Sequence, residues 1–143
     1  MSTNARMVAG SIVAALAMMA VAEIHSIPAD QVDPQKVYWG VATGFEKAGE
    51  VDYDEVVKAT PEYKQLKKSK VERGTGKYWI LMSQASDRTT RAISQVGQDT
   101  EYDLIVAQGY LASLEPAIPA EDITELILKE LGDDASRDDE KAK

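Results

Sequence analysis

Cysteine is absent from this 143-residue chain, and histidine occurs once, as His25. Without cysteine the chain has no disulfide framework, no thiol nucleophile and no cysteine to carry a lipid anchor. A Ser-His-Asp triad needs a histidine that is held rigidly, and a transition-metal site usually needs several ligands. A single histidine close to the N-terminus therefore argues against both. We therefore expect a protein that is not an enzyme and that holds no metal or other cofactor.

Basic residues are also scarce. Lys and Arg number 16 against 24 Asp and Glu, which gives a formal net charge of −8. Binding to nucleic acid without regard to sequence depends on neutralising phosphates with Lys and Arg, so this acidic balance argues against it. We expect no nucleic acid among the partners of the chain.

A long apolar run occurs only at the N-terminus. Arg6 is the one charge in residues 1–22, residues 7–22 are all apolar or small, and Ala20-Val21-Ala22 has the small-x-small pattern of a cleavage site. This layout predicts a secretory signal peptide cut after Ala22. The run is shorter than the roughly 20 residues that cross a membrane as a helix. Export to the periplasm follows, with a retained inner-membrane anchor as the alternative.

The next segments alternate between polar and apolar. Residues 23–35 are polar and contain Pro28 and Pro34, which predicts a linker. Residues 36–43 are rich in β-branched and aromatic side chains and favour a strand. Residues 51–57 are too short for their periodicity to distinguish strand from helix.

Thr60-Pro61-Glu62 has the cap, the proline and the acidic residue of a helix start. A charged helix follows it, and Arg73-Gly74-Thr75-Gly76-Lys77 interrupts that helix without the spacing of a phosphate-binding loop. Residues 78–96 then carry small and apolar residues at alternating spacings of four and three, a coiled-coil-like seam. We predict a helical hairpin over about residues 61–98. The seam is formed by Tyr78, Met82, Ala85, Thr89, Ala92 and Val96.

The remainder of the chain predicts a strand near residues 103–111, centred on Leu104-Ile105-Val106 and buried on both faces. Asp122 begins a helix over about 122–131, and Gly132 ends it. Residues 133–143 lack apolar side chains apart from alanine and predict a disordered acidic tail. The predicted class is α+β, with a single domain over residues 36–132.

This order of elements resembles the Skp/OmpH family of periplasmic chaperones. VDYDEVV at 51–57 with TPEYK at 60–64 is similar to the family's first strand and the start of its first arm helix. AISQV at 92–96 with YDLIV at 102–106 is similar to the returning arm and the strand after it. DIT at 122–124 with LIL at 126–128 is similar to the closing helix. The arms are much shortened here, to about 13 and 20 residues, or roughly 20 and 30 Å.

The resemblance implies a homotrimer whose short strands pair around a common axis and whose helical arms bind unfolded outer-membrane or envelope proteins. Basic and exposed apolar residues of the hairpin are the expected client-binding positions, and apolar residues of the strand and the closing helix are the expected oligomer or core positions. The client-binding set is Lys64, Lys67, Lys68, Lys70, Arg73, Tyr78, Trp79 and Met82; the oligomer or core set is Leu104, Ile105, Val106, Ile123, Leu126 and Ile127.

Two other functions remain open from the sequence. In one, the same domain is a structural or docking module of the cell envelope, anchored if residues 7–22 are retained. In the other, Asp52, Asp54 and Glu55 act as acid and base groups of an enzyme. A concave pocket holding two of these carboxylates would favour the enzyme.

Overall fold

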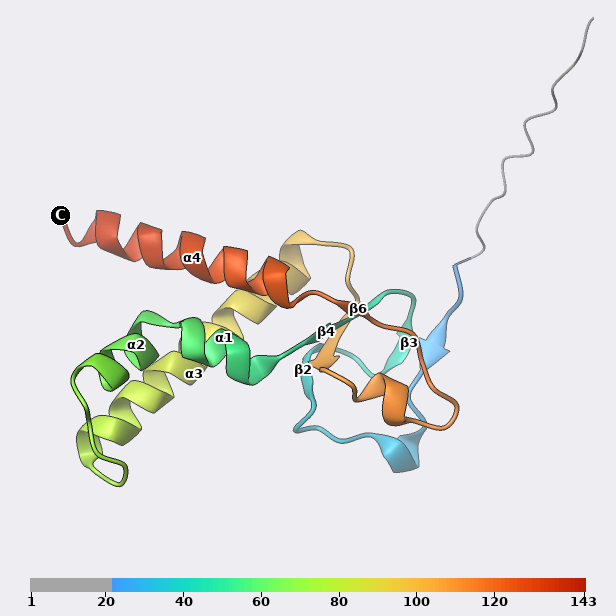
Figure 1. Ribbon diagram of the computed structural model, residues 1–143. Helices are drawn as coiled ribbons and strands as arrows, with labels where there is room; N and C mark the ends of the chain where they lie inside the picture. The colour runs from blue at the N-terminus through green and yellow to red at the C-terminus, as the bar shows by residue number, and fades with distance from the viewer. Residues whose placement is uncertain (1–21) are drawn as a thin grey trace, which may run out of the picture.

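The computed structural model describes residues 22–143. The predicted signal peptide lies outside the described residues except for Ala22. None of the helices within 22–143 has both the length and the apolar character needed to cross a membrane. The helices gather on one side of a small sheet (Figure 1). In chain order the elements are β1 (His25–Ser26), η1 (Ala29–Gln31), β2 (Val37–Gly40), β3 (Thr43–Phe45), β4 (Ala48–Val51), α1 (Tyr53–Ala59), α2 (Pro61–Lys68), α3 (Gly76–Asp99), β5 (Leu104–Ala107), η2 (Leu111–Ser113), β6 (Glu121–Asp122) and α4 (Thr124–Lys141).

The main sheet has the order β2-β5-β4-β6, with β5 antiparallel to β2 and parallel to β4. Helices α1, α2 and α3 form the crossover between the two parallel strands. Val51 pairs with Ala107, so β4 and β5 end together at one edge of the sheet. The predicted α+β class is confirmed.

The central strand β5 is buried on both faces, as its apolar run predicts. Leu104 and Val106 belong to one core cluster, which contains Phe45 and Leu111. Ile105 belongs to a second cluster, which the strand shares with the helices. A strand between two apolar layers has no polar face, and this explains its unbroken Leu-Ile-Val sequence.

Side-chain caps begin three of the helices. Asp52 accepts from the Glu55 backbone N–H at the start of α1. Thr60 accepts from the Tyr63 N–H, with Pro61 in the first helical position of α2. Thr75 accepts from the Tyr78 N–H at the start of α3. The helix start predicted at residues 60–62 is confirmed.

The structure decides one open assignment and corrects one strand prediction. Of residues 51–57, which the sequence left open between strand and helix, Val51 ends β4, Asp52 caps a helix and the rest lie in α1. The strand predicted over 103–111 ends at Ala107, because Gly109 adopts φ +78° and turns the chain into η2. The alternative strand at 36–43 is present in a shorter form as β2.

The predicted linker and the predicted tail are both ordered. In residues 23–35, Ile27 is buried in the core, and the Tyr110 hydroxyl donates to the Gln31 carbonyl at 2.7 Å. Helix α4 does not end at Gly132 but continues to Lys141. Asp134 and Asp138 on that extension pair with one arginine of α3 whose side chain is 11% exposed, a long-range contact that local composition does not reveal.

Candidate functional site

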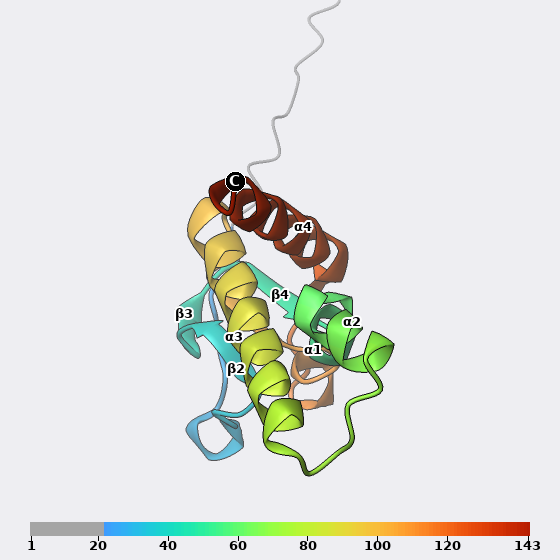
Figure 2. The same cartoon turned by 90° about the vertical axis from the view of Figure 1, so that its left-hand side faces the viewer.

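The predicted hairpin forms, and its turn projects away from the sheet (Figure 1). Figure 2 shows α2 lying along α3, with α4 across the other end of α3. We call residues 63–80 the hairpin tip: the end of α2, the connection and the first turn of α3. Because α2 has only eight residues, it covers only part of the 24-residue α3.

The chain leaves α2 through a strained residue. Lys70 has φ +49°, the left-handed region that glycine normally occupies at the end of a helix. The Val71 N–H donates to the Leu66 carbonyl at 3.1 Å, and the Lys70 N–H donates to the Lys67 carbonyl at 3.2 Å. These two hydrogen bonds form a Schellman motif with lysine in the position of the usual glycine.

A cavity of 370 Å³ opens in this tip, between the end of α2 and the start of α3. Apolar side chains form part of its wall, and three cations surround them with one anion, Glu72. The Lys67 ammonium group lies 5.5 Å from the centre of the Tyr63 ring. The lining residues are Tyr63, Leu66, Lys67, Lys70, Val71, Glu72, Arg73 and Tyr78.

Two exposed apolar side chains follow Tyr78, a residue of the cavity wall, in the chain. Trp79 is 64% exposed and Ile80 is 60% exposed. The Tyr78 and Trp79 rings meet edge to face, with their centres 5.5 Å apart. Farther along α3 the seam is buried at Ala85, at Thr89, at Ala92 and at Val96, where other elements cover the helix.

The structure therefore brings together only part of the predicted client-binding set. Lys67, Lys70, Arg73 and Tyr78 line the tip cavity, and Trp79 lies beside it. Lys64 instead lines a separate hollow between α2 and α4. Lys68 is exposed and Met82 is half-buried; neither lines the tip cavity.

The predicted oligomer or core set lies mostly inside the single chain. Leu104, Ile105, Val106, Ile123 and Ile127 are buried in the two core clusters. Leu126 is 38% exposed on α4. Strand β5 has a neighbour of the same chain on each side, so both of its edges are already paired.

Arg88 of α3 is an organising residue that the sequence did not indicate. Its guanidinium contacts Glu62 of α2 and both Asp134 and Asp138 of α4. The hydrogen bonds to Glu62 raise the pKa of Arg88 above its ordinary value, against the opposing effect of burial, and Asp138 adds to this rise. The three carboxylates are far away in sequence, so no local pattern marks them as partners of Arg88.

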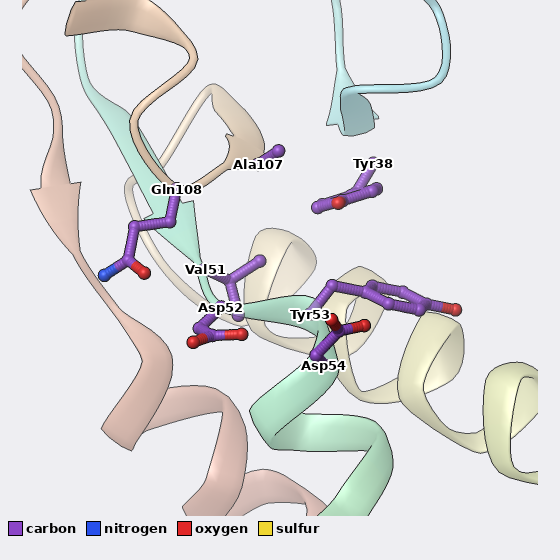
Figure 3. A pocket seen from close by; sticks show the side chains of 7 residues that line it. All are labelled: Tyr38, Val51, Asp52, Tyr53, Asp54, Ala107 and Gln108. Carbon is purple, nitrogen blue, oxygen red and sulfur yellow. The ribbon is translucent and has the colours of Figure 1, made fainter.

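A second cavity, of 290 Å³, lies where β4 and β5 end (Figure 3). We call it the carboxyl-edge pocket. This edge of parallel strands is where open α/β sheets commonly bind ligands. The lining residues are Tyr38, Val51, Asp52, Tyr53, Asp54, Ala107 and Gln108.

Two aromatic rings and two carboxylates line this pocket. The Tyr38 and Tyr53 rings lie 5.1 Å apart at an angle of 35°. Burial raises the pKa of Tyr38, and the charges of Tyr53, of Asp54 and of Asp52 raise it further. The enzyme hypothesis asked for a concave pocket that holds two of the carboxylates of Asp52, Asp54 and Glu55. Asp52 and Asp54 line this pocket, whereas Glu55 is exposed and does not line it.

Part of the acceptor capacity of this pocket is already used within the chain. One Asp52 oxygen is occupied as the cap of α1, at 3.1 Å from the Glu55 nitrogen. Among residues 22–143, no group of three or more His, Cys, Asp or Glu side chains is placed to hold a metal ion. His25 lies away from the pocket, in β1 beside Phe45, with 6.0 Å between ring centres.

Comparisons with known proteins give no relative: no protein-family model, no curated protein and no solved structure matches this chain.

Proposed function

We propose that this chain is an exported, non-enzymatic binding protein of the cell envelope that holds unfolded, acidic protein segments at its hairpin tip. The observation that carries the proposal is the exposure of Trp79 and Ile80 near the start of α3, together with a cavity at the same tip lined by Lys67, Lys70 and Arg73. The resemblance to the Skp/OmpH family is part of the same proposal, as are the periplasmic location and the homotrimer.

Apolar and cationic groups at the tip have complementary roles. Exposed tryptophan and isoleucine gain free energy when a client covers them, at about 25 cal/mol for each Å² of apolar surface removed from water. The cations favour segments rich in Asp and Glu and speed their encounter with the tip. The rest of the chain is acidic, with a net charge of −8 overall, so it repels such clients and directs them to the tip.

The dimensions of the arms favour contact at the tip over enclosure of a client. At 1.5 Å per residue, α2 is about 12 Å long and α3 about 36 Å long. Helix α2 packs on α3, and α3 packs on α4, so the inner faces of the hairpin are already occupied. A client held in this way remains outside the protein, with several copies acting together if the chain is a trimer.

Light scattering of a urea-denatured outer-membrane porin, diluted into buffer with the purified full chain, tests this function. We expect the chain to delay aggregation, and a variant with Trp79→Ser and Ile80→Ser to lose most of that effect. Val41→Ser is the matched control, because Val41 is 65% exposed but lies near β3, at the other end of the molecule. Equal protection by the tip variant and the control would disprove a tip-based chaperone.

Charge is tested separately with a triple variant, Lys67→Gln, Lys70→Gln and Arg73→Gln. We expect it to protect less well, and its loss to be greatest at low salt, because screening weakens attraction to acidic clients. The control removes the same charge from exposed lysines elsewhere, with Lys58→Gln, Lys129→Gln and Lys143→Gln. A similar loss in both variants would assign the effect to net charge alone.

The second candidate is a docking module of the envelope, and one observation favours it. The described chain begins beside β1, at the end of the molecule opposite the hairpin tip (Figure 1). A domain held to the inner membrane through residues 7–22 would therefore present its tip away from that membrane. Intact mass of the protein in the membrane fraction distinguishes the two: retention of residues 1–22 supports docking, and their removal supports a periplasmic chaperone.

A further inference from the structure

The carboxyl-edge pocket presents hydrogen-bond acceptors to its interior. Asp52 and Asp54 contribute carboxylates from the start of α1. The side-chain nitrogen of Gln108 donates to Asp122 at 3.2 Å, outside the pocket. Figure 3 shows the amide oxygen of Gln108 turned toward Asp52 as a result. A ligand of this pocket must therefore donate hydrogen bonds.

The pocket also has an aromatic wall. Tyr38 comes from β2 and Tyr53 from α1, and their rings lie one above the other (Figure 3). Two elements that are separate in the chain thus place two π-faces next to two carboxylates. Tyrosine faces attract cations, most strongly where water is partly excluded. This pairing distinguishes the pocket from an ordinary acidic surface.

We propose that the carboxyl-edge pocket is a binding site for a guanidinium group, carried either by a free small molecule or by an arginine side chain of a polypeptide. A guanidinium is planar, so it stacks on a tyrosine ring while its edge donates to carboxylates. An ammonium group is more strongly hydrated and lacks the planar fork. The volume of 290 Å³ holds a group of this size but not a large cofactor.

Two carboxylates outside the pocket hold the segment that follows β5. Glu50, at the end of β4, accepts from the Gly109 N–H at 3.1 Å, and Asp122 accepts from Gln108. These bonds fix the loop after β5, so the Gln108 oxygen is in place before a ligand arrives. A site arranged in advance loses less conformational entropy on binding. The proposal is independent of the tip and of the function proposed for it.

Binding is tested by nuclear magnetic resonance titration of the full chain with N-acetyl-arginine amide, which represents a peptide arginine, and with agmatine, which represents a free guanidine. We expect saturable shifts at the backbone amides of Tyr53, Asp54 and Gln108 with at least one of them. The neutral analogue N-acetyl-norleucine amide should give none. Saturation by N-acetyl-arginine amide alone assigns the site to polypeptide arginine, and saturation by agmatine alone assigns it to a small molecule.

Two variants test the chemistry. Asp54→Asn removes a carboxylate that is exposed and has no role as a cap, and we expect affinity about tenfold lower. Tyr38→Leu removes one aromatic face and should also weaken binding, with circular dichroism to establish that the fold is kept. Asp87→Asn, which makes the same charge change on the exposed surface of α3, is the control and should bind normally.

Three results would overturn the proposal. One is the absence of saturation by either guanidinium compound up to about 10 mM, near the weak limit of specific binding. Another is equal binding of the norleucine analogue. The third is an affinity that Asp54→Asn and Asp87→Asn change by the same factor, which would show attraction to net charge without a site.

Discussion

Arg88 binds Glu62 through paired hydrogen bonds: Arg88 Nε lies 2.9 Å and Nη2 lies 2.8 Å from the same Glu62 oxygen, Oε1. Nη1 of the same guanidinium donates to Asp134 at 3.1 Å and to Asp138 at 2.9 Å. One arginine thus joins α2, α3 and α4. The Arg88 and Glu62 side chains are only 11% and 15% exposed, so their attraction is screened less than that of a surface pair.

Removal of Arg88 should therefore destabilise the chain strongly. We expect Arg88→Met to lower the free energy of unfolding by about 3 kcal/mol, because three carboxylates lose their partner and Glu62 stays partly buried. Urea denaturation measures this difference. Arg91→Met is the control on the exposed side of α3 and should change stability by no more than about 0.5 kcal/mol. Equal effects of the two variants would contradict the role assigned to Arg88.

Two glycines in helices should respond to alanine in opposite directions. A Cβ at Gly97 of α3 would lie 2.3 Å from the Trp39 ring, whereas one at Gly132 of α4 would meet nothing within 4 Å. We expect Gly97→Ala to cost about 2 kcal/mol through overpacking, and Gly132→Ala to stabilise by about 1 kcal/mol through helix propensity. Thermal unfolding of both variants checks the signs. Stabilisation by Gly97→Ala would show that Trp39 moves aside freely.

Lys70 should show a conflict between stability and binding. We expect Lys70→Gly to stabilise the chain by about 1 kcal/mol, because glycine adopts the left-handed conformation without the steric cost that lysine bears. The same change removes a cation from the tip cavity and should reduce protection of an acidic client. Lys68→Gly, inside the last turn of α2, is the control and should destabilise by about 1 kcal/mol. Urea denaturation and light scattering measure the two effects separately.

Asp122 gives a prediction for pH. Hydrogen bonds from the Thr124 hydroxyl and backbone N–H hold the pKa of Asp122 below its ordinary value of 3.8, and Gln108 adds to this lowering. Its folded-state pKa is depressed, so its contribution to stability is complete above the unfolded-state value and is lost as pH falls through the folded-state value. The stability difference between the natural chain and Asp122→Asn should be constant above about pH 5 and fall to a smaller constant value well below pH 3.8. A constant difference over the whole acid range would contradict the hydrogen bonds to Thr124.

Local sequence signals located much of the fold. Thr60 with Pro61 marked a helix start, because a cap and a fixed φ act within one turn. The apolar Leu104-Ile105-Val106 run marked a strand buried on both faces. The tip was located in part, since its lysines and aromatic residues lie within one short stretch of chain. Residues 51–57 were ambiguous because a seven-residue run contains too few turns to establish a period.

Only the tertiary structure decided the rest, because it depends on contacts between distant residues. From the sequence alone, Asp134 and Asp138 belong to a predicted disordered tail. In the structure they pair with Arg88, which is far away in the chain, and they lie in the continuation of α4. The carboxyl-edge pocket needs Tyr38 from β2, Asp54 from α1 and Gln108 after β5, and no spacing in the sequence relates them. Composition and local periodicity determined which elements form, while the crossover between β4 and β5 determined which side chains meet.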